Sequence, residues 1–189
     1  MHKRKNGIMK IQGSVFRRKP LSVGHLIGQY IILEPMIAAT KEALISFALL
    51  GIKDAGHEGI VFWAGRELND LTIFTTVIVP TAEHSAQRVF VHKTAAAKAA
   101  QHARANHLGI LCQVHSHPCA DACHSSGDDD MIFMPYERML SIVIPNYGIG
   151  FNDIAQAGVH QFQRGRWLLC DPRSVQQNIH VVPTNLDLR

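Results

Sequence analysis

The feature that most constrains the fold is a series of short apolar runs, each bounded by turn residues. Residues 59–64 (GIVFWA) are apolar throughout, which is typical of a strand buried on both faces of a sheet. Residues 71–79 (LTIFTTVIV) are rich in β-branched side chains and follow the turn-like segment 65–70, so these two runs predict a hairpin. Similar patterns predict further strands at 30–33, 110–115, 140–144, 154–162 and 166–170.

Helical patterns separate several of these strands. Residues 36–50 carry Ala, Leu, Ile and Phe at helical spacing and stop at Gly51, and residues 93–107 form an Ala-rich helix that Gly109 would end. Thr94 or the residue before it is the expected cap, and a short helix is expected near 127–134. We therefore expect an α/β fold, a mixed sheet flanked by helices, and with 189 residues a single domain.

The charge is distributed unevenly along the chain. Residues 1–19 hold seven Lys or Arg and no acid, whereas the remaining chain has 12 basic and 15 acidic residues. We expect a basic N-terminal arm over residues 1–25, solvated rather than bound to nucleic acid, protein or membrane, followed by one domain over 26–189. No hydrophobic stretch follows the basic residues and the longest apolar run is 45–52, so a soluble, cytoplasmic protein with no nucleic-acid or membrane partner is expected.

Metal-capable side chains gather in the segment 115–130 (HSHPCADACHSSGDDD). His115 and His117 stand two apart at the end of a predicted strand, so their imidazoles project from the same face. Two histidines and one carboxylate leave a fourth position open, as in catalytic zinc sites, and Asp128 is available as the carboxylate. The segment therefore predicts a catalytic zinc centre.

Simpler readings of the same residues stay open at this point. An isolated His-x-His is usually two exposed polar side chains rather than a pair of metal ligands. Ser125-x-x-Asp128 fits a helix capping box. Cys119 and Cys123, with His124, fit a structural zinc site but lack a second pair nearby. In a reducing compartment the four cysteines should be free thiols. A register one residue longer would use Ser126 and Asp129, with Asp130 close by. The seven-residue gap favours Ser125 and Asp128.

The combined spacing of these residues is a more specific signal than any one of the fragments. His115-x-His117, Pro118, Ser125 and Asp128 have the spacing His-x-His-x7-Ser-x2-Asp, which resembles the JAMM signature of the JAB/MPN+ metalloprotease family, in its small prokaryotic deubiquitinase-like form. The family's upstream glutamate, followed seven residues later by glycine, matches Glu58 and Gly65. One departure is Val61, which stands where the family often has an intermediate glycine.

The resemblance implies a function and a role for each residue. His115, His117 and Asp128 would bind Zn²⁺, Glu58 would be the general base and Ser125 would stabilise the oxyanion. The implied activity is that of an isopeptidase or peptidase that removes or processes a ubiquitin-like modifier after its C-terminal glycine. It would act in a bacterial ubiquitin-like conjugation system, a class that includes antiviral systems, with E1-like and E2-like proteins as partners. A sulfur-carrier processing protease and a non-catalytic MPN scaffold are the alternatives.

Overall fold

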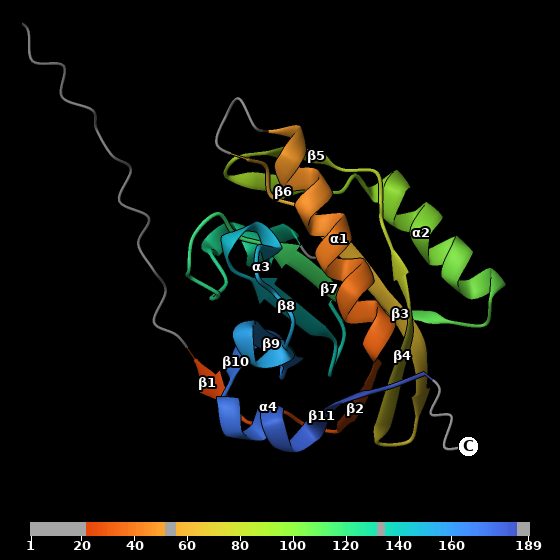
Figure 1. The fold of residues 1–189 in the computed structure, drawn as a ribbon. Helices are drawn as coiled ribbons and strands as arrows, with labels where there is room; N and C mark the ends of the chain where they lie inside the picture. Colours follow the sequence, from red (N-terminus) through yellow and green to blue (C-terminus); the bar gives the residue numbers. More distant parts are fainter. Residues whose placement is uncertain (1–21, 52–55, 132–134, 185–189) are drawn as a thin grey trace, which may run out of the picture.

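A computed structural model describes residues 22–51, 56–131 and 135–184, which form one mixed β-sheet with helices on both faces (Figure 1). In spatial order the strands of this sheet are β1 (Val23–Gly24), β10 (Arg166–Cys170), β9 (Gly158–Gln163), β8 (Leu140–Ile144), β7 (Gly109–Ser116), β3 (Ile60–Leu68), β4 (Leu71–Ile78), β2 (Gln29–Leu33) and β11 (Ile179–Val182). A separate hairpin consists of β5 (Glu83–Ser85) and β6 (Arg88–Phe90). The helices are α1 (Glu34–Leu50), α2 (Lys93–Ala105), α3 (Ser126–Met131) and α4 (Pro172–Asn178), with 3-10 turns at Asn146–Gly148 and Ile154–Gln156.

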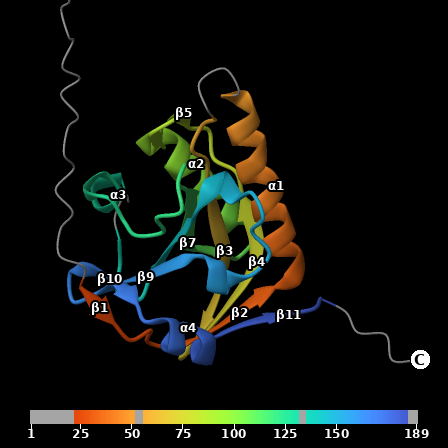
Figure 2. The same ribbon diagram turned by 60° about the vertical axis from the view of Figure 1, so that its left-hand side comes forward.

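The sheet has a different helix on each face. α1 covers one face of the sheet (Figures 1 and 2). The main core on this face includes Leu44, Val61 and Val114, and Trp63 donates its indole N–H to Thr40 of the helix at 2.8 Å. The opposite face holds a second, smaller core of Ile60, Phe62, Val89 and Ala99, the last of which belongs to α2. Alternate residues of β3 thus serve both cores, which explains why its sequence is continuously apolar.

The predicted α/β class, with a mixed sheet flanked by helices in a single domain, is confirmed. The predicted turn at 65–70 is wrong, because β3 continues to Leu68 and the reversal is confined to Asn69 and Asp70. Gly65 allows this continuation: a Cβ there would lie 1.9 Å from the Ile73 carbonyl oxygen, and the register shifts between Ala64 and Gly65. Only glycine permits so close an approach of the two strands.

Other boundaries also differ from expectation. Residues 154–156 form a 3-10 turn instead of the start of a strand, because Asp153 and Gln156 close a capping box around it. α1 begins at Glu34 because proline is tolerated in a first helical turn. Neither Thr94 nor Lys93 caps α2; His92 occupies that position without a side-chain bond. The sequence also did not reveal the β5–β6 hairpin, α4, β11 or the short strand β1.

The ends of the chain are described only in part. Residues 1–21 of the expected basic arm lie outside the described residues, as do 132–134 of the expected third helix. The last residues of the expected arm, Val23–Gly24, pair with Leu169 and Cys170 as strand β1. Among the described residues, no helix is long and apolar enough to cross a membrane.

Candidate metal centre

His115 and His117 lie at the carboxyl end of β7, near the middle of the sheet. His115 pairs with Ile60 across the β3–β7 ladder, so its imidazole is on the face opposite α1. The strand ends at Ser116, and the backbone N–H of His117 still donates to Ile144 at 2.9 Å. The strand therefore presents both rings to the same side, as the spacing predicts.

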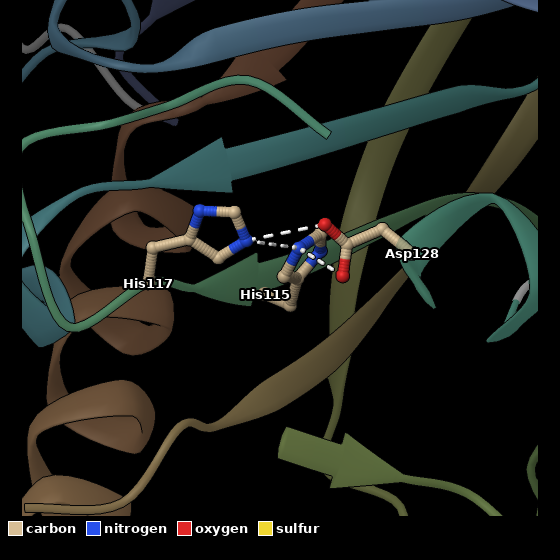
Figure 3. Close-up of side chains that lie close together, drawn as sticks. All are labelled: His115, His117 and Asp128. Atoms are coloured by element: carbon tan, nitrogen blue, oxygen red, sulfur yellow. Dashed lines mark hydrogen bonds and ion pairs between the residues drawn. The ribbon is translucent and has the colours of Figure 1, made fainter. Parts of the chain in front are cut away.

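Asp128 meets these two rings from the start of α3 (Figure 3). Its two carboxylate oxygens lie 3.4 Å from Nε2 of His115 and 3.2 Å from Nε2 of His117, and the two Nε2 atoms are 3.3 Å apart. Zinc bonds of about 2.0–2.1 Å in a tetrahedral site place ligand atoms about 3.3–3.4 Å apart. The three side chains are 0–8% exposed. Their spacing and burial fit a zinc ion.

The capping box predicted from Ser125 and Asp128 is confirmed, and it orients the carboxylate. The Ser125 N–H donates to Oδ2 of Asp128 at 2.6 Å, and the Asp128 N–H donates to the Ser125 hydroxyl oxygen at 3.3 Å. The start of the helix thus fixes Asp128 in place, while Ser125 itself is exposed. Asp128 is thus both a member of the capping box and a candidate metal ligand.

The electrostatics of the three groups also suit a metal. Burial opposes ionisation of Asp128, but hydrogen bonds from His115 and His117 hold its pKa well below the usual range. Burial also lowers the pKa of His115, so its imidazole stays neutral and can act as a ligand. The pKa of His117 is raised, because contacts with Asp128 outweigh the effect of burial. The Nδ1–H of His117 donates to the Asp121 carbonyl at 2.9 Å, which leaves Nε2 for the ligand position.

Glu58 lies just before β3 and is 6% exposed. Burial raises the pKa of its carboxyl to about 7, with His117 lowering it and Asp128 raising it further. Glu58 is therefore close enough to the centre for the charges of His117 and Asp128 to shift its pKa. With a pKa near neutral pH, its carboxylate can accept a proton there. Glu67 and Glu83, the alternative carboxylates to which the role of base could be assigned, are exposed.

Ser116 is a functional candidate that the sequence did not reveal. Its hydroxyl oxygen accepts the Gly59 N–H at 2.9 Å, and its own N–H donates to the Gly59 carbonyl at 3.0 Å. Ser116 thus joins the strand of the histidines to the segment of Glu58. The one available signal is a polar residue at the end of an otherwise apolar strand.

Tyr147 makes a second link around the centre that the sequence did not reveal. Its N–H donates to the His117 carbonyl at 2.8 Å, and its hydroxyl donates to the carbonyls of Gly56 at 3.5 Å and Ala86 at 3.3 Å. Its φ of 56° is a left-handed value that is unusual for tyrosine. The residue therefore connects the metal-ligand segment, the Glu58 segment and the turn of the β5–β6 hairpin.

The remaining predicted residues lie around the centre without joining it. Cys119 is exposed and Cys123 half-buried. The Asp129 carboxylate accepts a hydrogen bond from Nδ1 of His124 at 3.0 Å, so Asp129 does not replace Asp128 as a candidate ligand. Within the described part of the chain, His115, His117 and Asp128 are the only three such side chains close enough to share a metal ion.

An apolar groove of about 1240 Å³ lies elsewhere, between α1 and α4. Its lining includes Ile37, Ile45, Val175 and Ile179. Because α1 covers the face opposite His115, this groove belongs to the other side of the sheet. It does not form part of the metal centre.

Known proteins resemble this chain in sequence and in fold. A family model of prokaryotic homologues of the JAB domain matches residues 40–156, a span that contains Glu58, Ser125 and the three candidate ligands. A probable metalloprotease of Sinorhizobium fredii, y4jG, is 25% identical over 124 residues, which is 63% of this chain and 76% of that protein.

One solved structure has a similar fold, and a second is similar over most of the chain. A solution structure of a protein from Desulfitobacterium hafniense aligns with a TM-score of 0.53 at 16% identity, over 82% of this chain and 95% of that one. A crystal structure of a JAB1/MPN domain protein from Archaeoglobus fulgidus aligns with a TM-score of 0.40 at 15% identity, over 75% of this chain and 96% of that one.

Proposed function

Because the chain belongs to the family of prokaryotic homologues of the JAB domain, we propose that it is a zinc peptidase that cleaves after the C-terminal glycine of a ubiquitin-like modifier. The observation that carries the proposal is the complete set of chemical groups at one place. A buried His-His-Asp cluster, a buried glutamate with a pKa of about 7 and an exposed serine lie together around the carboxyl end of β7. A non-catalytic scaffold would have no need of this set.

The chain's own residues divide the chemistry between them. His115, His117 and Asp128 would hold zinc, which when bound supplies a Lewis acid that acidifies water and polarises a carbonyl. Glu58 takes a proton from the attacking water as the oxygen–carbon bond forms. The Ser125 hydroxyl donates a hydrogen bond to the developing oxyanion. Glu58 then passes the proton to the amine nitrogen as the carbon–nitrogen bond breaks.

The substrate class is the finer part of the proposal. The family resemblance of the motif supports an amide that joins a modifier's terminal glycine to a lysine or to a short C-terminal extension. We place the protein in a bacterial ubiquitin-like conjugation system, with E1-like and E2-like proteins as partners. An antiviral role and a cytoplasmic location belong to the same proposal.

A panel of ubiquitin-like proteins ending in Gly-Gly, each fused to a reporter through that end, tests the activity. We expect zinc-loaded protein to release the reporter after the second glycine and a chelator to stop the reaction. Glu58→Gln should keep zinc but lose cleavage, because an amide cannot accept the proton of water. Glu67→Gln, an exposed glutamate of β3, is the matched control and should cleave normally.

The outcomes separate the candidate functions. Cleavage of lysine-linked conjugates supports deconjugation, whereas cleavage of sulfur-carrier precursors alone would favour a processing protease. Zinc binding without cleavage of any fusion would contradict the proposed activity and favour a scaffold. Near-normal turnover by Glu58→Gln would assign the base to another carboxylate.

A further inference from the structure

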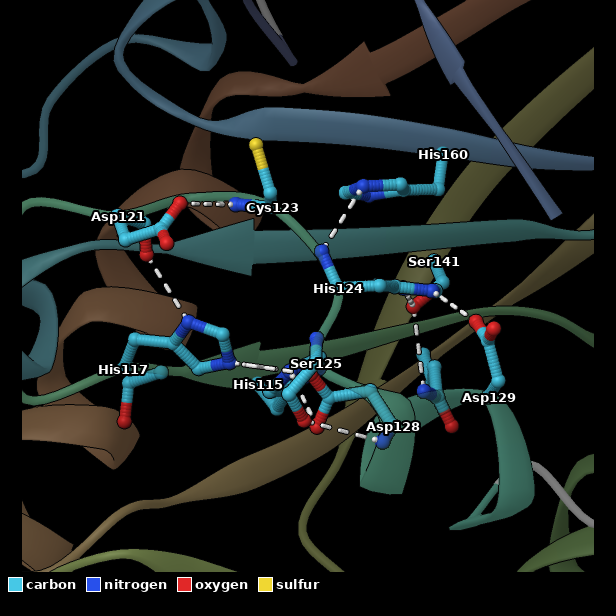
Figure 4. A network of polar contacts seen from close by, with 12 residues as sticks. His115, His117, Asp121, Cys123, His124, Ser125, Asp128, Asp129, Ser141 and His160 are labelled. Atoms are coloured by element: carbon cyan, nitrogen blue, oxygen red, sulfur yellow. Dashed lines mark hydrogen bonds and ion pairs between the residues drawn. The ribbon is translucent and has the colours of Figure 1, made fainter. Parts of the chain in front are cut away.

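His124 sits beside the metal centre, and neither the motif nor the proposed chemistry uses it. Its ring stacks on that of His160 (Figure 4), with centroids 3.8 Å apart. The ring also lies edge-on to Trp167, with centroids 5.5 Å apart. Its side chain is 6% exposed, and its ring centroid is 6.0 Å from that of His115. This histidine is therefore buried immediately behind a candidate ligand.

The ring of His124 packs against a row of buried polar side chains on three adjacent strands. Gln113, Ser141 and His160 are register partners on β7, β8 and β9, so they share the face that carries His115. All three are 0–3% exposed. Three buried polar groups side by side are costly unless each is hydrogen-bonded. The loop that carries His124 bonds two of them, the Ser141 hydroxyl and Nε2 of His160, while Nδ1 of His160 has no partner among the described residues.

The hydrogen bonds form one directed chain. The Gln113 amide donates to the Ser141 hydroxyl oxygen at 3.1 Å, and that hydroxyl donates to Nε2 of His124 at 2.8 Å. Nδ1–H of His124 then donates to the Asp129 carboxylate at 3.0 Å. In addition, the His124 backbone N–H donates to Nε2 of His160 at 3.2 Å. Both ring nitrogens and the backbone N–H are thereby fixed.

The order Ser141, His124, Asp129 is that of a serine hydrolase triad, but it is not a second active site. Ser141 has no exposed surface, so no substrate carbonyl can reach its hydroxyl. Its bonds to Gln113 and His124 instead hold the loop on the sheet. The arrangement is suited to positioning rather than to attack.

The position of His124 in the chain explains what it holds. It immediately precedes Ser125, and its partner Asp129 immediately follows Asp128, so the bond between them closes around both ends of the capping box. We propose that His124 is a positioning residue that holds Asp128 at the distance from the two ligand histidines that zinc binding requires. This inference rests on the proposed function only in requiring that the centre binds zinc.

Zinc affinity of the full chain, measured by competition with a chromophoric chelator, tests the proposal without any substrate. His124→Phe keeps the aromatic ring but removes both ring nitrogens, and we expect zinc to bind about 10–100-fold more weakly, the usual cost of losing a group that orients a ligand. His124→Gln, which keeps one donor and one acceptor, should recover part of this loss. His25→Phe is the matched control, because His25 pairs with Asp171 at 2.7 Å but is 89% exposed.

If His124 only stabilised the fold, a different result would follow. His124→Phe would then lower the unfolding temperature of the metal-free protein but leave its zinc affinity unchanged. Wild-type zinc affinity in a folded His124→Phe variant would therefore overturn the proposal. If that variant does not fold, Ser141→Ala and Asp129→Ala each remove one bond of the chain, and unchanged affinity in both would overturn it equally. A wild-type protein that binds zinc but cleaves no modifier contradicts the proposed function alone and leaves this comparison intact.

Discussion

Glu58, the proposed general base, shows at the scale of one residue how a buried acid lowers stability at neutral pH. Burial raises its pKa from 4.5 to about 7, so the folded protein binds this proton more tightly than the unfolded chain does. The resulting stability is fully present below about pH 4.5 and is lost as the pH rises through about 7. An ionised Glu58 is thus a cost that the fold carries at the pH where the base is useful.

We therefore expect metal-free Glu58→Gln to be more stable than metal-free wild type at pH 8, by about 1–2 kcal/mol after allowance for solvent screening. The difference should vanish near pH 4, where glutamine resembles the protonated acid. Urea unfolding at the two pH values measures it. Glu67→Gln should show no such pH-dependent gain, and equal stability of Glu58→Gln and wild type at pH 8 would contradict the prediction.

Ser116 provides a second prediction at this scale. Ser116→Ala removes the hydroxyl that accepts the Gly59 N–H and leaves that buried donor without a partner, at a cost of about 1–3 kcal/mol in unfolding free energy. Because the substitution leaves the three candidate ligands untouched, we expect zinc content to stay normal while turnover falls. Elemental analysis and single-turnover kinetics measure the two effects, and loss of zinc would show that Ser116 acts on the ligands instead.

Among the secondary-structure elements, those with strong local signals were predictable. β8 and β10 have the predicted bounds, and β7 differs from its prediction by one residue at each end. β5, β6 and β11 are too short to show a period, and they depend on tertiary pairing. The same distinction applies to the site: the ligands follow from local spacing, whereas the roles of Ser116 and His124 depend on the register of strands distant in sequence. Polar residues within apolar strands, such as Gln113 and Ser141, were the only hint.

The contact between β9 and the loop before α3 gives a prediction at the element scale. A Cβ at Gly158 would lie 1.7 Å from the Ala122 carbonyl oxygen, so Gly158→Ala must push the loop from the sheet. We expect this overpacking to cost about 1–3 kcal/mol and to weaken zinc binding. Thermal unfolding with and without zinc measures both. Gly109→Ala is the control, because its added methyl meets only the Leu111 side chain, and its zinc affinity should stay normal. A loss of zinc affinity in Gly109→Ala as large as that in Gly158→Ala would contradict the prediction.

The whole molecule places a narrow requirement on its substrate. The candidate ligands and Glu58 are at most 8% exposed, whereas Ser125 next to them is open to solvent. The reacting amide must therefore enter at the end of an extended tail, and glycine suits such a passage because it has no Cβ to clash. The β5–β6 hairpin lies beside this entrance, since the Ser85 carbonyl accepts the Glu58 N–H at 2.8 Å. Extended peptides commonly bind along exposed strand edges of this kind.

We accordingly expect that replacing the terminal glycine of a cleavable modifier by leucine blocks cleavage, with a fall in kcat/KM of at least about 100-fold, equivalent to about 3 kcal/mol of transition-state stabilisation. A short unfolded peptide with the same Gly-Gly end should be cut with a much higher KM, because we propose that the folded surface of the modifier supplies most of the binding energy. Steady-state kinetics on the three substrates measures these effects. If the peptide and the leucine variant were cut as well as the parent modifier, the protein would be a general metallopeptidase and the glycine-specific proposal would be wrong.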